Sequence, residues 1–303
     1  MPESNFTAVP LTLSVTIWKK LIIVFRKAAI HQVNNMKKAI SVIIKCIIFF
    51  MSWALLISFI PSPESENGAV WRLWAELIPM LLIIGVTFAF WLIEKRKIKL
   101  HIFENPVKSI ITGILTGAIW LFIPVGIMYL MGNIHFAGKN EIDLFYVWLL
   151  AVFLNVIMQE LLIRGYMYSL IKQKYNTITA VIVTTAIFTA LHGGAFESGI
   201  IPVLNVLTTS LLLTSAFEFT GSLITPIIMH GVWNAVGALV LGGVSLADDY
   251  PNLFITSFTG NEIISGGACK IEGSIFVLII NIILIGIFIL FRRKNELDNK
   301  AQY

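Results

Sequence analysis

The feature that most constrains this chain is a series of apolar runs, each about as long as a helix that crosses a bilayer. Such a helix needs about 20 mainly apolar residues to span roughly 30 Å of hydrocarbon. Hydrophobic residues make up 57% of the 303 residues and charged residues 13%, whereas soluble domains have about 45 to 50% and about 25%. The sequence therefore predicts an all-α fold, a polytopic transmembrane helical bundle. The eight predicted spans are 39–60, 71–94, 109–131, 144–163, 177–194, 200–218, 222–243 and 274–291.

The basic residues are concentrated in alternate connectors between these spans. They lie before the first span, after the second, after the fourth and after the eighth: Lys19, Lys20, Arg26, Lys27, Lys37, Lys38; Lys95, Arg96, Lys97, Lys99, Lys108; Lys172, Lys174; and Arg292, Arg293, Lys294. The opposite connectors hold only Arg72, Lys139 and Lys270. The positive-inside rule then places both termini in the cytoplasm. Because the net charge of +5 follows from this topology signal, we expect no nucleic-acid partner.

The chain divides into three parts by composition. Residues 1–38 form an N-terminal cytoplasmic or interfacial segment, 39–291 the eight-span membrane domain, and 292–303 a cytoplasmic tail. The apolar stretch 11–25 is interrupted by Lys19 and Lys20 and is short for a span, so we interpret it as an interfacial amphipathic helix. An alternative start of the protein is Met36, with the upstream residues as an extension. No internal repeat or separate soluble domain is visible in the sequence.

Several ionisable residues lie inside the predicted spans, where a charge costs on the order of 2.5 to 3.5 kcal/mol and usually marks function. Glu160 and Arg164 in the fourth span are four residues apart, so they share one helix face and can neutralise each other. Gln159 is rotated by about 100° from Glu160 and lines an adjacent part of the same surface. A structural ion pair is the alternative interpretation of Glu160 and Arg164.

Two further spans contribute histidines. The fifth span ends in Phe188-Thr-Ala-Leu-His192, and the seventh contains His230-Gly-Val-Trp-Asn234. Taken alone, His192 could satisfy a carbonyl at a helix end, and His230 with Asn234 could join helices by hydrogen bonds. Together with Glu160, however, these residues supply a base, an acid and oxyanion donors. This is the set needed to hydrolyse a carbonyl compound with activated water.

The three segments resemble the CAAX protease and bacteriocin-processing family (CPBP, or Abi), which are intramembrane glutamate-dependent endopeptidases. The family motifs EExxxR, FxxxH and HxxxN correspond to QELLIRG at 159–165, FTALH at 188–192 and HGVWN at 230–234, within a CPBP-like core at 144–243. The resemblance implies that Glu160 corresponds to the second glutamate of the motif and Arg164 to its arginine, that His192 helps to activate water, and that His230 with Asn234 stabilises the oxyanion. It also implies a multi-pass protein of the bacterial inner membrane.

One position departs from the family pattern, because Gln159 stands where the motif has its first glutamate. A carboxamide can orient a water but cannot take its proton. Three interpretations remain open: Glu160 replaces the missing base, the chain is an inactive homologue that acts as a membrane scaffold or bacteriocin-immunity factor, or Gln159 is a variant of a glutamate.

The resemblance also bears on the partners and cofactors of the protein. We expect membrane lipid and a membrane-associated peptide or protein substrate as partners, and no cofactor. No metal is expected, since the ligands do not have HExxH-type spacing. A proton-coupled transporter is a weaker alternative, because transporters usually have repeats and paired broken helices.

Overall fold

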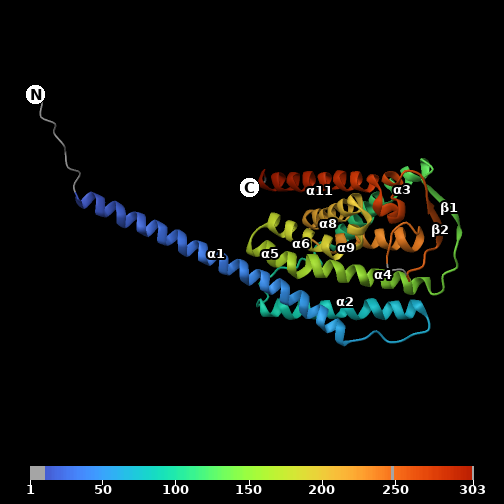
Figure 1. The fold of residues 1–303 in the computed structure, drawn as a ribbon, viewed down its shortest axis with the longest axis horizontal. Helices are drawn as coiled ribbons and strands as arrows, with labels where there is room; N and C mark the ends of the chain where they lie inside the picture. Colours follow the sequence, from blue (N-terminus) through green and yellow to red (C-terminus); the bar gives the residue numbers. More distant parts are fainter. Residues whose placement is uncertain (1–10, 247–248, 302–303) are drawn as a thin grey trace, which may run out of the picture. The chain divides into compact units, whose positions relative to one another are not determined.

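The structure, a computed structural model, describes residues 11–246 and 249–301 and consists mainly of helices (Figure 1). The chain divides into two compact units, Met1–Ile48 and Phe49–Tyr303. The helical elements are α1 (Leu11–Phe59), α2 (Gly68–Ile93), α3 (Pro106–Leu130), α4 (Phe145–Glu160), the π-helix η1 (Leu161–Met167), α5 (Tyr168–Lys174), α6 (Thr177–Leu191), α7 (Gly194–Ser198), α8 (Ile200–Thr220), α9 (Ile224–Asn234), the π-helix η2 (Ala235–Val240), α10 (Glu262–Ser265), the 3-10 helix η3 (Gly267–Gly273) and α11 (Ile275–Ala301). The strands are β1 (Ile134–Lys139) and β2 (Phe254–Phe258).

Each predicted span coincides with an apolar helix. Among the described residues, six helical stretches are long and apolar enough to cross a membrane: 30–59, 68–93, 106–130, 145–174, 200–220 and 267–295. Two shorter apolar helices cover 177–191 and 224–240. The prediction of an all-α, polytopic membrane protein is confirmed. The number of eight crossings and the cytoplasmic placement of both termini stay predictions, since α6 with its 15 residues is shorter than the roughly 17 that a crossing requires.

Helix α1 is continuous where the sequence predicts a boundary between residues 38 and 39. It runs from Leu11 to Phe59 without a break, because lysine is a good helix former and does not interrupt a helix at positions 19 and 20. The described part of the predicted N-terminal segment and the first predicted span therefore belong to one continuous helix. Residues 1–10 of that segment lie outside the described residues.

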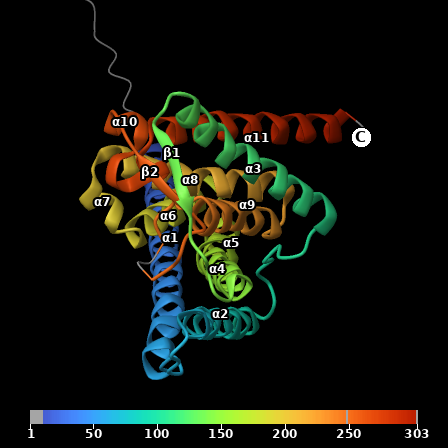
Figure 2. The ribbon, with the colours of Figure 1, turned by 90° about the vertical axis from the view of Figure 1, so that its right-hand side faces the viewer.

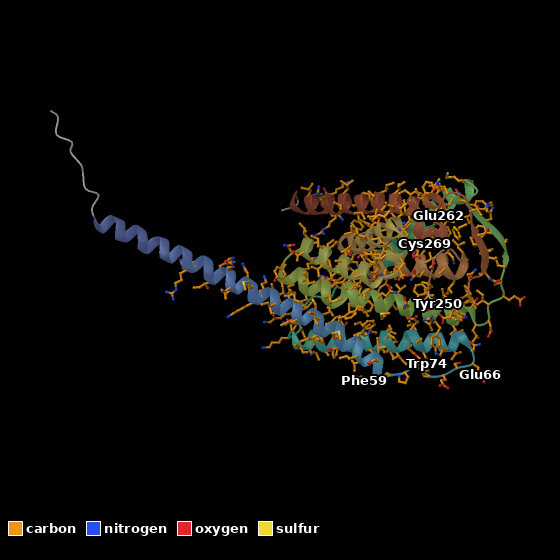
Figure 3. The ribbon with its side chains drawn as sticks, in the orientation of Figure 1. Phe59, Glu66, Trp74, Tyr250, Glu262 and Cys269 are labelled. Atoms are coloured by element: carbon orange, nitrogen blue, oxygen red, sulfur yellow. The ribbon has the colours of Figure 1, made fainter. Side chains whose placement is uncertain are left out.

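The connectors 131–144 and 244–273 fold against each other, which the apolar pattern does not predict. β1 pairs with β2 in antiparallel register, with Ile134 opposite Phe258 and Lys139 opposite Phe254. Seen along α4, the two strands lie over the near end of the bundle (Figure 2). Tyr250 and Glu262, from the longer connector, lie at the same end (Figure 3). The described part of the connector 244–273 is thus a structured cover over one end of the helices.

Two glycines allow α3 to pack closely on α9. A Cβ atom built on Gly113 would lie 2.7 Å from Cβ of Ile228, and one on Gly117 would lie 3.2 Å from the α9 backbone. Small residues four apart permit such approach between membrane helices. Beside them, Trp120 of α3 stacks on Trp233 of α9 with ring centroids 4.2 Å apart. This contact fixes α9, the helix that supplies two of the predicted site residues.

Candidate active site

Glu160 and Arg164 form a fully buried ion pair at the junction of α4 and η1. Arg164 Nη1 donates to both carboxylate oxygens of Glu160, at 2.9 and 2.8 Å, and neither side chain has any exposed surface. The sequence places these residues on one helix face, and the structure shows them in contact. Because a buried charge without a partner is costly, each residue depends on the other.

The remaining donors of Arg164 tie this pair to α8. Nε donates to Thr214 Oγ1 at 3.1 Å, and Nη2 donates to the backbone oxygen and to Oγ of Ser210, at 3.0 and 3.1 Å. A guanidinium has five N–H donors in a fixed planar geometry, and here every one of them has an acceptor. Arg164 therefore joins η1 to α8 through a hydrogen-bond network that leaves no polar group of the guanidinium unsatisfied.

His230 of α9 extends the same network. Its Nδ1 lies 2.9 Å from Glu160 Oε1, and since a carboxylate only accepts hydrogen bonds, Nδ1 carries a proton. Nε2 is the ring nitrogen that remains for other partners. The buried carboxylate of Glu160 thus fixes the orientation of the His230 imidazole. Functional histidines are often oriented in this way, by a hydrogen bond from the ring nitrogen that does not take part in the reaction.

Both helices that end in a predicted site residue continue as a π-helix. α4 ends at Glu160 and continues as η1, and α9 ends at Asn234 and continues as η2. A π-helical turn is wider than an α-helical turn and occurs frequently at functional sites. It changes the direction of the side chains that follow. Nothing in the apolar pattern of the sequence predicts these turns.

His192 caps α6 and has a fixed tautomer. Its Nδ1 is 2.8 Å from the backbone oxygen of Phe188, and because a carbonyl only accepts, Nδ1 carries the proton and the neutral ring has its lone pair on Nε2. The Phe188 ring stacks on the imidazole with centroids 4.3 Å apart, and the Arg164 guanidinium lies 5.1 Å from the Phe188 ring centroid. His192 does satisfy a helix-end carbonyl, as its structural interpretation expects, and this contact uses Nδ1 and not the basic Nε2.

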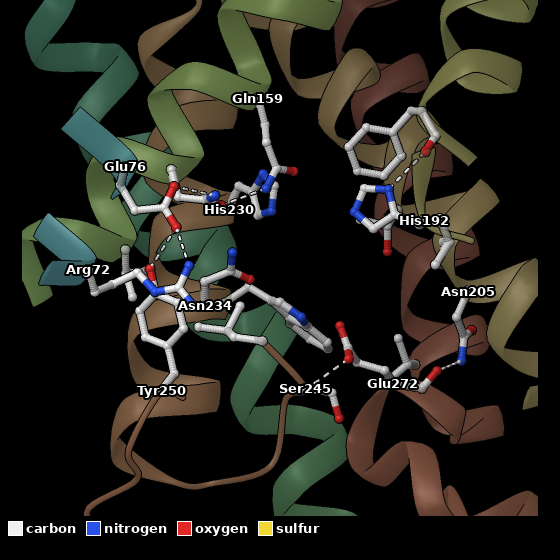
Figure 4. Close-up of a pocket in the computed structure, with 18 residues that line it drawn as sticks. Arg72, Glu76, Gln159, His192, Asn205, His230, Asn234, Ser245, Tyr250 and Glu272 are labelled. Atoms are coloured by element: carbon white, nitrogen blue, oxygen red, sulfur yellow. Dashed lines mark hydrogen bonds and ion pairs between the residues drawn. The ribbon is translucent and has the colours of Figure 1, made fainter. Parts of the chain in front are cut away.

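A cavity of about 300 Å³ brings five of the predicted site residues together. Gln159, His192, His230 and Asn234 all line it, together with Phe188. Figure 4 shows His192 on the opposite side of the cavity from Gln159 and His230, with Nε2 directed inward. Glu160 and Arg164 are not among the described residues that line it. Glu160 is linked to the cavity wall through its hydrogen bond with His230, and this placement bears directly on the predicted role of Glu160 as the base.

Four residues with charged or phenolic side chains line the cavity without having been predicted as site residues. Arg72 and Glu76 come from the first turns of α2, and Tyr250 and Glu272 from the connector between η2 and α11. Arg72 donates to Glu76 at 3.1 Å and also pairs with Asp249. In the sequence Arg72 serves only as a topology signal, although Glu76 lies four residues further along the same predicted span. That spacing is a signal for an intramembrane ion pair.

Tyr250 and Glu272 show how the connector enters the site. Tyr250 Oη donates to Glu76 Oε1 at 3.1 Å, and burial together with the neighbouring Glu76 carboxylate raises the pKa of the Tyr250 phenol. The phenol therefore keeps its proton as a donor. Glu272 Oε2 accepts a hydrogen bond from the Ser245 backbone N–H at 3.1 Å. No periodic pattern in the sequence marks either connector residue.

Within residues 11–246 and 249–301, no group of three or more His, Cys, Asp or Glu side chains is placed to hold a metal ion. The two histidines of the cavity each use Nδ1 for a protein acceptor. The expectation that the site works without a metal or other cofactor stays a prediction, which chelation can test.

Comparison with known proteins identifies the region that holds this site. Residues 141–236 match the family model described as type II CAAX prenyl endopeptidase, Rce1-like. The matched range contains all three motif segments. Comparisons with curated proteins and with solved structures found no match. In agreement with the family that the motifs indicate, the middle of this multi-pass membrane protein is similar to the Rce1-like endopeptidases of the CAAX protease type.

Proposed function

We propose that the protein is a membrane endopeptidase that hydrolyses a peptide bond in a membrane-associated peptide or protein. The observation that carries this proposal is the shared cavity, which is lined by two histidines of fixed orientation and by the carboxamides of Gln159 and Asn234. The Rce1-like match supports an intramembrane peptidase activity of this kind. We place the protein in the inner membrane of a bacterium, in contact with lipid through its exposed apolar helix faces.

The geometry favours His192 rather than Glu160 as the base. Glu160 has no exposed surface and both its oxygens accept from Arg164, so a water in the cavity cannot reach it. His192 has its lone pair on Nε2, directed into the cavity. In our proposal Glu160 is therefore a positioning residue for His230, and His192 takes the proton of the attacking water.

Hydrolysis would then proceed in two steps. As the water oxygen attacks the substrate carbonyl carbon, its proton moves to Nε2 of His192. The developing oxyanion accepts hydrogen bonds from the Asn234 carboxamide and from Nε2 of His230, which donates when that ring is an imidazolium. The C–N bond breaks as His192 returns the proton to the leaving nitrogen, which gives a free carboxyl group and an amine.

The position of the cavity indicates the side from which a substrate enters. Its lining includes Ser245, Leu246, Tyr250 and Glu272 from the connector 244–273, which the positive-inside rule places outside the cytoplasm. The opposite ends of the helices carry the basic clusters. We therefore propose that the scissile bond is presented at the outer surface of the membrane, as expected for an exported or surface-anchored peptide.

One observation favours a second candidate function, that of an inactive homologue which binds peptides without cleaving them. Gln159 occupies the position of the first glutamate of the family motif and has no basicity. Such a protein could serve as a membrane scaffold or as an immunity factor against a bacteriocin. It would retain the cavity and the peptide affinity of the enzyme but would show no turnover.

The decisive experiment is a cleavage assay in proteoliposomes. Purified protein would be incubated with a library of membrane-anchored peptides, and products would be identified by mass spectrometry. Products that depend on His192 support the endopeptidase. Binding of peptides with no product, in the wild type and in His192→Ala alike, would refute it in favour of the inactive homologue.

A further inference from the structure

A chain of hydrogen bonds connects Gln159 to a carboxylate on another helix. Gln159 Nε2 donates to Asn155 Oδ1 at 2.6 Å, one turn earlier on α4. Asn155 Nδ2 in turn donates to Glu76 Oε2 at 2.8 Å. The other oxygen of Glu76 accepts from Arg72 and from Tyr250, each at 3.1 Å. Glu76 is 5% exposed, and all three side chains of this hydrogen-bond chain line the cavity.

The charge at one end fixes the direction of every bond in the chain. Glu76 faces a guanidinium and acts as a carboxylate, which can only accept. Asn155 must therefore turn its NH₂ group toward Glu76 and its oxygen toward Gln159. Gln159 must in turn direct its own NH₂ group at Asn155. The orientation of both carboxamides thus follows from chemistry, although the two ends of an amide are hard to distinguish by shape.

This direction leaves the Gln159 oxygen as an acceptor at the cavity. Gln159 Oε1 is buried and has no hydrogen-bond partner among the described residues. Figure 4 shows it on the side of the carboxamide that faces His192 across the cavity. A buried acceptor without a partner is costly. Such a group in a cavity is suited to accept a hydrogen bond from a ligand or a water.

We propose that Glu76 is a positioning residue which, through Asn155, holds Gln159 as the hydrogen-bond acceptor for the attacking water. The inference rests on the proposed peptidase function and deepens it. Gln159 then orients the attacking water, which is one part of the role of the motif glutamate. His192 performs the other part and takes the proton. The negative charge that the family motif places at position 159 is located here on Glu76, at the other end of the Asn155 bridge.

A swap of the carboxylate follows from this arrangement. Asn155 has one NH₂ group and one oxygen, so it can serve a carboxylate at position 76 or at position 159 but not at both. Gln159→Glu alone would place two carboxylates on the same carboxamide. Glu76→Gln alone would remove the charge that fixes the direction of the chain. The double variant would reverse the Asn155 side chain and satisfy both ends again.

The test is a cycle of four proteins: wild type, Glu76→Gln, Gln159→Glu and the double variant. Thermal unfolding in one detergent is measured first, because it requires no activity. We expect Gln159→Glu to lower the unfolding temperature and the double variant to recover most of that loss. Additive shifts in the two single variants would overturn the proposal. Glu66→Gln is the matched control, since Glu66 is exposed just before α2 (Figure 3).

Turnover of the same four proteins tests whether Glu76 positions Gln159 for catalysis. We expect Glu76→Gln to lower kcat about 10-fold to 100-fold, as for a misplaced reacting group, with KM little changed. The double variant should exceed Glu76→Gln in kcat and gain an acidic limb in its pH–rate profile from the new carboxylate. An active double variant with the wild-type pH profile and no recovery of kcat would refute the positioning role. If no protein of the cycle cleaves peptide but stability recovers, the peptidase function fails while the direction of the chain stands.

Discussion

Glu160 Oε1 accepts hydrogen bonds from Arg164 Nη1 and from His230 Nδ1, both at 2.9 Å. One oxygen atom thus joins the guanidinium of η1 to the imidazole of α9 inside the bundle. Because the lone pairs of this carboxylate accept hydrogen bonds from donors in fixed positions, its role is structural. It also explains how a helix-bound histidine obtains a defined orientation at the wall of the cavity. The roles of Glu160 and His192 can therefore be separated by mutation.

Replacement of His192 should reduce turnover far more than replacement of Glu160. His192→Ala removes the only base that our mechanism uses, which costs about 10²- to 10⁴-fold in kcat. Glu160→Gln keeps an acceptor for His230 and should cost less. Initial rates of peptide cleavage in proteoliposomes measure both. The matched control is His135→Ala, since His135 is exposed on β1. If folded Glu160→Gln protein lost as much turnover as His192→Ala, the assignment of Glu160 to positioning and of His192 to proton transfer would be wrong.

Loss of Arg164 should destabilise the fold itself. Arg164→Met leaves the Glu160 carboxylate buried with one partner fewer, and removal of one member of a buried ion pair costs about 3 to 5 kcal/mol. Arg164→Lys should recover only part of this, because an ammonium cannot reach the acceptors on α8 and Glu160 at the same time.

Unfolding in detergent, followed by circular dichroism, measures the loss for the Arg164 variants. Lys172→Met provides a comparison, since Lys172 pairs with Glu218 at a site where its side chain is 38% exposed. Because Lys172 is partly exposed and the buried Glu218 keeps Arg292 and Tyr168 as partners, loss of Lys172 should cost less than about 1 kcal/mol. Equal losses in Arg164→Met and Lys172→Met would contradict the assignment of the Arg164 network as a buried structural element.

Asn234 should act on the chemical step rather than on binding. In our mechanism its carboxamide donates to the oxyanion, and removal of one such donor costs about 10²- to 10³-fold in kcat. Asn234→Ala should therefore lower kcat with little change in KM. Steady-state kinetics separate the two, with Asn133→Ala in the connector before β1 as a control. A change confined to KM would make Asn234 a substrate-binding residue instead.

The site residues differ in how far they could be predicted from sequence. Glu160 and Arg164 were readable as a pair, since their spacing alone places them on one helix face. His192 and His230 lie on different helices, and only the order of the motifs indicated that they share a site. Their tautomers could not be predicted, because each depends on one acceptor atom, the Phe188 oxygen or the Glu160 carboxylate.

In the fold as well, features that depend on neighbouring residues could be predicted, and features that depend on distant contacts could not. The apolar runs predict the helices, because the bilayer requires a fixed length and internal hydrogen bonds. The pairing of β1 with β2 joins segments more than 100 residues apart, and nothing local in either strand encodes its partner. The same holds for Glu76 and Asn155, whose contact depends on how α2 packs against α4.

Chelation should leave activity unchanged. Two histidines and a glutamate could in principle hold zinc. In this site, however, the Glu160 oxygens already accept from Arg164 and His230, and Glu160 lies behind the cavity wall. Cleavage rates before and after exhaustive dialysis against a strong chelator test this expectation. A loss of rate that added zinc restores would show that the side chains rearrange around a metal.

The contact between α3 and α9 predicts a contrast between two glycines of one helix. A Cβ atom at Gly113 would lie 2.7 Å from Cβ of Ile228 and 3.1 Å from the backbone oxygen of Thr225, whereas one at Gly126 would meet nothing within 4 Å. Gly113→Ala should therefore force the helices apart at a cost of about 1 to 3 kcal/mol. Gly126→Ala should be neutral or slightly stabilising, because alanine is the better helix former.

Unfolding temperatures in the same detergent measure both variants. Since α9 carries His230 and Asn234, Gly113→Ala should also lower turnover. Equal stability of the two variants would mean that α3 and α9 do not pack as closely as the structure shows.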